Sequence, residues 1–327
     1  MEKKTIREAY ADFFKALSLN SVAAAKIDSS NVYQLANPKN RKLMDKLVED
    51  NLLPESHLEN VENFLDFYNQ VKSGKSGLIL MEHYSNTDLP AFLYMLEHSG
   101  NSDLADLSKR TVAIAGMKLN EDNPIVRAFA ESFTRVVIYP TRSLTKNEEK
   151  AQSEEEAKEE MLKARKINLA AMRAMDDCKK RGEVILVFPS GTRYRSGHPE
   201  TKRGLREIDS YLRLFDIAIC VSINGSILEI QDGKEDMLSD LVGPDKLVFT
   251  SSSVIECKKF RSEYLATLPE NEPDPKQKMI DKIMDILEVQ HENVEHGLLN
   301  KSFVNQKTLL SSGYFFPKFK RRYLLAL

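Results

Sequence analysis

Beyond Gly77, short apolar runs alternate with longer stretches of helical periodicity. This alternation predicts an α/β fold, with a mixed, largely parallel central sheet covered by helices on both faces. The expected strands are Leu78–Met81, Thr111–Ala115, Arg135–Tyr139, Val184–Phe188, Ile217–Ile223 and Lys246–Ile255. Helices are expected between them, notably a long charged helix from Lys146 to Arg181 and others from Pro275 to Leu299. Ligands of such sheets bind at the carboxyl ends of the strands.

The first part of the chain has a different pattern. Its apolar residues recur at helical spacing from Glu2 to about Ser73, with a break near Pro38. A length of 327 residues suits one large unit with a smaller one attached. We therefore expect a small helical N-terminal domain of residues 1–75, followed by an α/β domain of residues 76–327.

The composition excludes several classes of protein. With 42% hydrophobic and 29% charged residues, the chain resembles an ordinary globular protein rather than a disordered one. The three cysteines, Cys178, Cys220 and Cys257, are too widely spaced for a disulfide framework or a zinc site. No apolar run approaches the roughly 20 residues that span a bilayer, and the N-terminus lacks the apolar stretch of a signal peptide. A cytoplasmic protein is the expectation.

A histidine and an aspartate follow the first expected strand, in the segment HYSNTD. Neutral imidazole has a pKa near 6.5 and can accept a proton from a hydroxyl, so His83 is the candidate general base. Asp88 lies five residues later and could fold back to the far ring nitrogen, which would fix the tautomer. Asp88 could also cap a helix that begins at Leu89, and the two roles are compatible.

A basic segment, PSGTRYR, follows the strand that ends at Phe188. Arg193 and Arg195 are two residues apart, so in an extended segment they would point the same way and present two guanidinium groups to one phosphate. Gly191 would let the backbone approach a ligand closely, and Ser190 and Thr192 would shape the same loop. The alternative is a basic surface turn that forms salt bridges.

Further positive charge follows two other expected strands. Lys118 comes after the second strand, while Arg142 and Lys146 come after the third. Together these residues predict a basic rim that suits a phosphorylated alcohol, although ordinary solvent exposure also explains the two lysines. A serine hydrolase with Ser190 as nucleophile is an alternative, but the neighbours of Ser190 do not form the GxSxG elbow. A noncatalytic lipid- or phosphate-binding protein is another.

The two segments resemble those of the glycerolipid acyltransferases, whose motifs are H-x4-D and a later Pro-x-Gly-x-Arg. His83 and Asp88 match the first motif, while Pro189, Gly191 and Arg193 match the second. The Pro-Ser-Gly-x-Arg-x-Arg form is similar to that of the soluble, plastid-type glycerol-3-phosphate acyltransferases. Members of that group have a helical N-terminal domain before an α/β domain.

The resemblance implies transfer of a fatty acyl group from an acyl carrier protein (ACP) or coenzyme A to the sn-1 hydroxyl of glycerol 3-phosphate, the first step of phospholipid synthesis. His83 would deprotonate the hydroxyl and Asp88 would orient His83. Arg193 and Arg195 would hold the phosphate, with Arg142 as a further basic residue. No metal, bound cofactor or nucleic acid is implied. A near alternative has 1-acylglycerol 3-phosphate as the acceptor.

The C-terminal segment is basic and aromatic. From His296 to the end of the chain there are six Lys or Arg residues and no acidic residue, with aromatic residues interleaved near the end. Such a segment suits the surface of an anionic bilayer, so peripheral contact with the inner face of the membrane is expected. Docking of the aromatic residues on the folded domain is the alternative.

Overall fold

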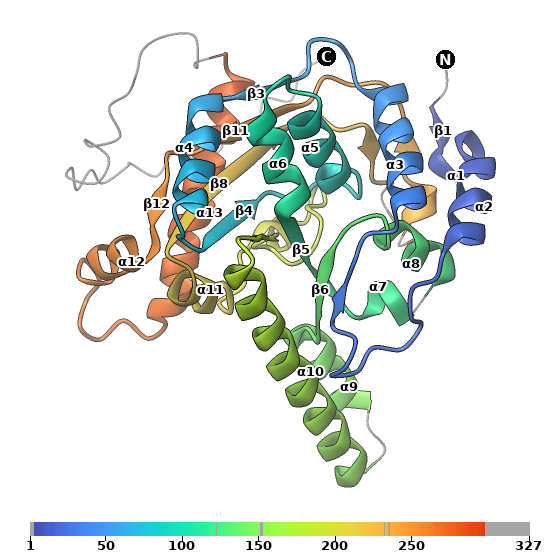
Figure 1. Cartoon of the computed structure of the whole chain (residues 1–327). Coiled ribbons are helices and arrows are strands. Elements are labelled where there is room, and N and C mark those ends of the chain that lie inside the picture. Colours follow the sequence, from blue (N-terminus) through green and yellow to red (C-terminus); the bar gives the residue numbers. More distant parts are fainter. Residues whose placement is uncertain (1–2, 122, 151–152, 232, 235, 298–327) are drawn as a thin grey trace, which may run out of the picture.

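The computed structural model describes residues 3–121, 123–150, 153–231, 233–234 and 236–297 (Figure 1). Its main sheet has the strand order β2-β6-β5-β7-β4-β8-β11-β3, and β12 pairs with β8 as well. The strands are β2 (Tyr33–Gln34), β3 (His57–Glu59), β4 (Gly77–Met81), β5 (Thr111–Gly116), β6 (Arg135–Ile138), β7 (Val184–Val187), β8 (Ile217–Asn224), β11 (Val248–Ser251) and β12 (Ile255–Glu256).

The five central strands, β6, β5, β7, β4 and β8, run parallel to one another. Strand β2 is antiparallel to β6, both β11 and β12 are antiparallel to β8, and β3 is parallel to β11 at the edge. The predicted mixed, largely parallel sheet is therefore confirmed. All six expected strands are present, with boundaries that differ by a few residues at most except at β11, which is shorter than expected.

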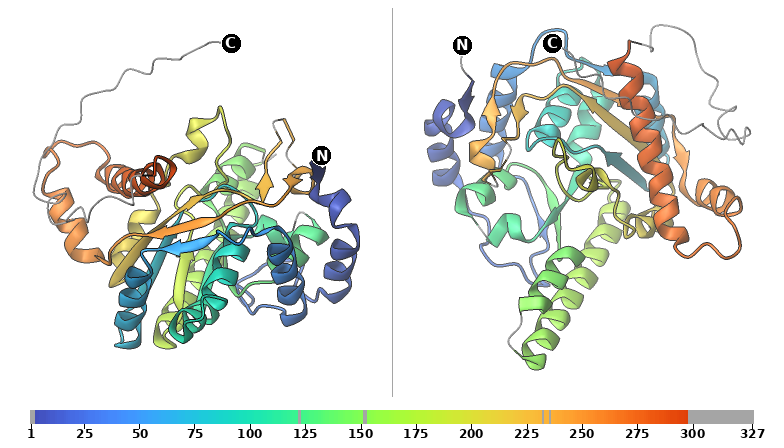
Figure 2. Two further views of the ribbon diagram at one scale, coloured as in Figure 1. Left: turned by 90° about the horizontal axis from the view of Figure 1, so that it is seen from above. Right: turned by 180° about the vertical axis from the view of Figure 1, so that it is seen from behind.

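Helices cover both faces of this sheet (Figures 1 and 2). Because successive strand residues point to opposite faces, Ile79 and Met81 join one hydrophobic cluster while Leu78 and Leu80 join another. The first cluster includes residues of α3 (Pro38–Asn51), α4 (Val61–Lys72), α5 (Asp88–Glu97), α6 (Ser102–Arg110) and α8 (Pro124–Ala130). The second includes residues of α10 (Glu154–Lys180), α11 (Ile208–Leu214), α12 (Cys257–Leu265) and α13 (Pro275–Glu295).

The expected helix from Lys146 to Arg181 is in fact two helices, α9 (Thr141–Lys150) and α10. A cap explains the second start, because the Ser153 hydroxyl accepts a hydrogen bond of 3.2 Å from the amide of Glu156. Glutamates at 154–156 then fill the first turn, where the helix dipole favours negative charge. Shorter elements are α7 (Lys118–Glu121), η1 (Pro199–Lys202) and η2 (Met237–Ser239).

The N-terminal 75 residues contribute strands as well as helices. Besides α1 (Ile6–Ala9) and α2 (Ala11–Asn20), they hold β2, β3 and β1 (Lys4–Thr5), and β1 joins β10 (Leu241–Val242) and β9 (Leu228–Glu229) in a small second sheet. Phe14, Leu17 and Met44 share the hydrophobic cluster that contains Ile79. The segment is thus mainly helical but continuous with the main core. Its existence as a separate domain of residues 1–75 stays a prediction.

Membrane-spanning helices and metal-binding groups were sought in the part of the chain that the structure describes. Within those residues, no helix has both the length and the apolar character needed to cross a bilayer. The same residues contain no group of three or more His, Cys, Asp or Glu side chains arranged to hold a metal ion. All three cysteines are buried and unpaired.

Candidate active site

The two motifs meet at the carboxyl edge of the sheet. Strands β4 and β7 are parallel neighbours in which Leu80 pairs with Val187, and His83 and Ser190 each follow three residues later. Neighbouring strands lie about 4.8 Å apart, so the two segments leave the sheet side by side. They are joined directly, because the amide of Tyr194 donates a 2.7 Å hydrogen bond to the carbonyl oxygen of His83.

His83 and Asp88 form the predicted pair. Nδ1 of His83 lies 3.0 Å from Oδ2 of Asp88. This contact favours the tautomer in which Nδ1 carries the proton and Nε2 is free to accept one. The imidazole also stacks on the ring of Phe188, with centroids 3.9 Å apart and planes 15° from parallel. The ring is therefore fixed in orientation, while 18% of the side chain remains exposed to substrate.

Asp88 is almost completely buried and is held by its own loop. It accepts hydrogen bonds from the amides of Tyr84 (2.6 Å) and Ser85 (2.8 Å) and from the Ser85 hydroxyl (2.7 Å). The N-cap of α5 is Thr87, so Asp88 is the first helical residue and does not cap the helix. Its carboxylate instead anchors the loop that carries the histidine.

The loop after β7 is tightly packed at Gly191, where the close neighbour is the side chain of Leu205; the predicted close approach of a ligand stays a prediction. This glycine has a φ of +62°, and a Cβ built there would come within 2.4 Å of Cδ1 of Leu205. The Ser190 hydroxyl donates a 2.7 Å hydrogen bond to the carbonyl oxygen of Thr192 across the turn. Ser190 therefore braces the loop, and no hydrogen bond joins it to His83 among the described residues.

Arg193 and Arg195 have different surroundings. Arg193 forms an ion pair with Asp240, and the two side chains are only 12% and 2% exposed. Burial raises the pKa of Asp240 and outweighs the opposite effect of the Arg193 charge. Arg195 is partly buried, and among the described residues no carboxylate lies within 4.0 Å of its guanidinium. Of the two, Arg195 is the one with charge available for an anion.

The other predicted basic residues lie farther from His83 along the sheet edge. Lys118 is exposed at the start of α7, after β5. Since β7 separates β5 from β4, the end of β5 is about 10 Å away, at two strand spacings. Arg142 and Lys146 belong to α9, which follows β6 one strand farther out, and their side chains lie outside the described part of the structure. A phosphate-binding role for these three stays a prediction.

A second polar cluster adjoins the histidine. Glu82 is buried and accepts hydrogen bonds from the amide of Ile223 (2.8 Å) and the hydroxyl of Tyr84 (3.0 Å), and its Oε2 lies 3.1 Å from Nδ1 of His291. Burial disfavours charge on His291, but the hydrogen bond and charge of Glu82 outweigh it, so the pKa of His291 is raised. Burial and the charge of Glu82 also raise the pKa of Tyr84.

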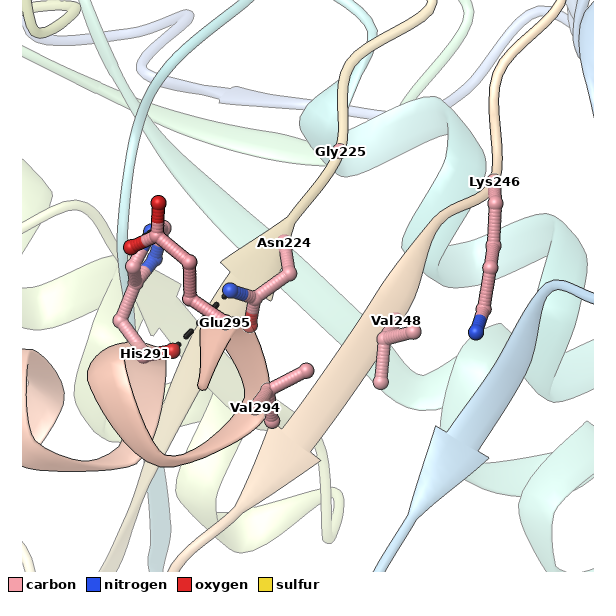
Figure 3. A pocket seen from close by; sticks show the side chains of 7 residues that line it. All are labelled: Asn224, Gly225, Lys246, Val248, His291, Val294 and Glu295. Carbon is pink, nitrogen blue, oxygen red and sulfur yellow. Dashed lines mark hydrogen bonds and ion pairs between the residues drawn. The ribbon is translucent and has the colours of Figure 1, made fainter. Parts of the chain in front are cut away.

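His291 also lines a cavity of about 270 Å³ at the carboxyl end of β8 (Figure 3). Asn224, Lys246, Val248 and Glu295 are among its other lining residues, and the Asn224 amide donates a 3.0 Å hydrogen bond to the carbonyl oxygen of His291. Neither motif contributes to its lining. The cavity is thus separate from the His83 pair.

Comparison with known proteins decides the family. The model of the acyltransferase family matches residues 57–222, which is just over half of the chain and includes both motifs. The chain belongs to the acyltransferase family. Acyl transfer is accordingly the reaction class of this chain. A search of curated proteins gave no match.

Among solved structures, this acyltransferase chain is similar to the crystal structure of the 1-acyl-sn-glycerophosphate (LPA) acyltransferase PlsC from Thermotoga maritima. The two chains are 16% identical, and the match covers 86% of this chain and 88% of the other, with a TM-score of 0.38.

Four residues around the motifs escaped the sequence analysis, namely Phe188, Asp240, Glu82 and His291. A signal existed for Phe188, since it ends an apolar run immediately before Pro189. Glu82 is also next to the motif, but it looks like an ordinary strand-end residue. Asp240 and His291 carry no local signal at all, because only the folded chain brings them to the motifs.

Proposed function

We propose that this acyltransferase transfers a fatty acyl group from a thioester donor to the sn-1 hydroxyl of glycerol 3-phosphate. The observation that carries the proposal is the direct contact between the two motifs, which brings the His83–Asp88 pair beside the Arg195 loop. A base and an available cation at one strand edge suit an acceptor that contains both a hydroxyl and a phosphate. Family membership supports the acyl transfer itself.

In the proposed mechanism, Nε2 of His83 takes the proton of the sn-1 hydroxyl as its oxygen attacks the thioester carbonyl. Asp88 holds Nδ1–H and stabilises the imidazolium that forms. The tetrahedral intermediate then collapses with cleavage of the carbon–sulfur bond, and the thiolate leaves with the proton from His83. An ester replaces a thioester, so atoms and charge balance without a metal or an enzyme-bound acyl group. Alignment and one proton transfer supply the catalysis.

Arg195 would bind the acceptor phosphate first, since its guanidinium has no described carboxylate partner. Arg193 is already neutralised by Asp240, so it would contribute as part of a buried pair that supports the loop. We therefore propose unequal roles for the two arginines. Lys118, Arg142 and Lys146 would add long-range attraction for the phosphate from farther along the edge.

The experiment that tests the proposal supplies the full chain with acyl-ACP or acyl-coenzyme A and with either glycerol 3-phosphate or 1-acylglycerol 3-phosphate, and identifies products by mass spectrometry. The proposal predicts 1-acylglycerol 3-phosphate as the product. Diacylated product from the second acceptor, without reaction of the first, would instead identify the chain as a 1-acylglycerol-3-phosphate acyltransferase. Free fatty acid formed equally with and without acceptor, and lost in Ser190→Ala, would support a hydrolase.

A further inference from the structure

Tyr84, the residue after the candidate base, is held at both its backbone and its side chain. Its amide donates a 2.6 Å hydrogen bond to Oδ2 of Asp88, the atom that also contacts His83. Its hydroxyl donates a 3.0 Å hydrogen bond to Glu82 and lies 3.3 Å from Nδ1 of His291. Because the two attachments belong to one residue, release of the hydroxyl would also loosen the amide that fixes Asp88.

The hydroxyl of Tyr84 is held by an ion pair that needs both of its partners. Glu82 is almost completely buried, and its Oε2 lies 3.1 Å from Nδ1 of His291. Burial lowers the pKa of His291, but the hydrogen bond and charge of Glu82 outweigh burial and raise it, which favours a charged pair. Among the described residues, no other basic side chain comes within 4.0 Å of the Glu82 carboxylate. Loss of His291 would therefore leave a buried negative charge next to the base.

The backbone that carries His291 is anchored to the main sheet. In α13, the side-chain amide of Gln290 donates hydrogen bonds to the carbonyl oxygens of Thr250 (2.8 Å) and Cys220 (3.3 Å). The amide of Asn224, at the end of β8, donates a 3.0 Å hydrogen bond to the carbonyl oxygen of His291 (Figure 3). These anchors all precede residue 297; the basic C-terminal segment beyond it lies outside the described residues, and its membrane contact stays a prediction. The imidazole of His291 thus extends from a fixed support.

The same helix is connected to the loop that carries Arg195. The rings of Tyr84 and Tyr194 meet edge to face. Nζ of Lys202 lies 5.8 Å from the ring centroid of Tyr84 and 5.5 Å from that of Tyr194, and it forms an ion pair with Glu288 of α13. One helix therefore supports the loops of both motifs.

We propose that His291 is a positioning residue for acyl transfer. It holds Glu82 and the hydroxyl of Tyr84, and through Tyr84 it keeps Asp88 where Asp88 can orient His83. His291 takes no part in making or breaking bonds. This role deepens the proposed function and rests on it for the identity of the base, whereas the tautomer of His83 can be measured without any substrate.

Nuclear magnetic resonance of the full chain labelled with ¹⁵N-histidine tests the link. The ring nitrogen shifts report which nitrogen of His83 carries the proton when the ring is neutral, and His83→Gln identifies its signals among the six histidines. His291→Ala removes the imidazole, and His291→Asn restores a donor close to the position of Nδ1. Tyr84→Phe removes only the hydroxyl, so it keeps the pair of Glu82 with His291.

The matched control is His98→Ala. His98 is also stacked on a tyrosine, Tyr94, with centroids 4.0 Å apart, but it is exposed at the end of α5 away from the motif. Circular dichroism and urea unfolding would verify that each variant folds. If His291→Ala fails to fold because Glu82 has lost its counter-charge, Tyr84→Phe and His291→Asn still test the link.

In the wild type and in the control, neutral His83 should carry its proton on Nδ1. His291→Ala and Tyr84→Phe should move part of the population to the Nε2–H tautomer and lower kcat for acyl transfer by about 10- to 10²-fold, since catalysis depends on the orientation of the base. His291→Asn should recover most of both effects. The His291→Ala Tyr84→Phe double variant should lose little more kcat than His291→Ala alone, because the two changes break one connection.

An unchanged His83 tautomer in folded Tyr84→Phe and His291→Ala would overturn the proposal, and any accompanying loss of kcat would then reflect a structural role of His291. Independent, additive losses of kcat from the two changes would overturn it too. Failure of the base assignment looks different: His83→Gln would keep the wild-type kcat, while the tautomer measurement would still show whether His291 positions His83.

Discussion

The amide of Tyr194 donates a 2.7 Å hydrogen bond to the carbonyl oxygen of His83, and this contact links two motifs that are a hundred residues apart in the sequence. Tyr84 and Tyr194, which follow His83 and Arg193 respectively, also meet edge to face with ring centroids 5.8 Å apart. The candidate base and the candidate phosphate-binding loop are therefore one structural unit. A change in either loop is expected to affect the other.

Replacement of Asp88 by Asn should lower kcat strongly. The two amides and the hydroxyl that now donate to the carboxylate would meet the NH₂ group of the new side chain, so some of these hydrogen bonds would be lost. The neutral amide would also no longer stabilise the imidazolium form of His83. We expect kcat to fall by about 10²–10⁴-fold and the free energy of unfolding to fall by about 1–3 kcal/mol. Steady-state kinetics and urea unfolding measure the two effects. Asp103→Asn, at an exposed ion pair with Lys72, is the control and should leave both nearly unchanged.

Gly191 and Gly197 provide a matched pair for the loop geometry. Both have positive φ, but a Cβ would meet Leu205 at 2.4 Å only at Gly191, whereas nothing lies within 4 Å at Gly197. Gly197→Ala should lower the free energy of unfolding by about 1–2 kcal/mol, which is the backbone strain of an alanine at positive φ. Gly191→Ala should lower it by about 1–3 kcal/mol more, because the added methyl group overpacks against Leu205. Urea unfolding compares them. Equal costs at the two positions would show that the close contact with Leu205 is not a constraint.

The two arginines should respond differently to alanine. Arg195→Ala should mainly raise the KM for glycerol 3-phosphate and leave stability nearly unchanged. Arg193→Ala should cost about 3 kcal/mol of stability, because it leaves Asp240 buried without its counter-charge. Acceptor titrations and urea unfolding separate these effects. If the Arg193→Ala Asp240→Ala double variant is as unstable as Arg193→Ala, the buried charge is not the cause.

The raised pKa of His291 predicts that the free energy of unfolding depends on pH. A histidine whose pKa is raised in the folded state contributes stability that is fully present below the unfolded pKa, near 6.5, and is lost as the pH rises through the folded pKa. Wild-type stability should therefore fall more steeply above pH 6.5 than that of His291→Gln. Glu82, Tyr84, Lys202 and Glu295 surround this histidine and set the shift. Urea unfolding from pH 5.5 to 8.5 measures the slopes, and parallel curves would contradict the role of Glu82.

Much of this arrangement could be predicted because the signals are local. An apolar run that ends in a polar motif locates a strand end, and a pair five residues apart such as His83 and Asp88 needs only one turn to meet. The start of α10 after Ser153 could also have been predicted from the sequence, because Ser153 and Glu156 match the S-x-x-E pattern that begins a helix. The short strand β3 could not, because its three residues become a strand only beside β11.

The residues that contact the motifs, Asp240 and His291, could not be predicted because they are far from the motifs in the sequence. Asp240 is 47 residues from Arg193, and His291 is 209 residues from Glu82. Nothing near either residue distinguishes it from a solvated side chain of the same type. The pairing of Arg193 with Asp240 also changed the expected site, because it leaves Arg195 as the arginine with available charge.

The central claim is that His83 is the base for acyl transfer. The most direct test compares kcat for acyl transfer to glycerol 3-phosphate in the wild type, His83→Gln and His57→Gln, the last removing an exposed histidine on β3. The account predicts that His83→Gln folds like the wild type and loses at least about 10²-fold in kcat, while His57→Gln keeps wild-type activity. A folded His83→Gln enzyme with wild-type kcat would contradict it.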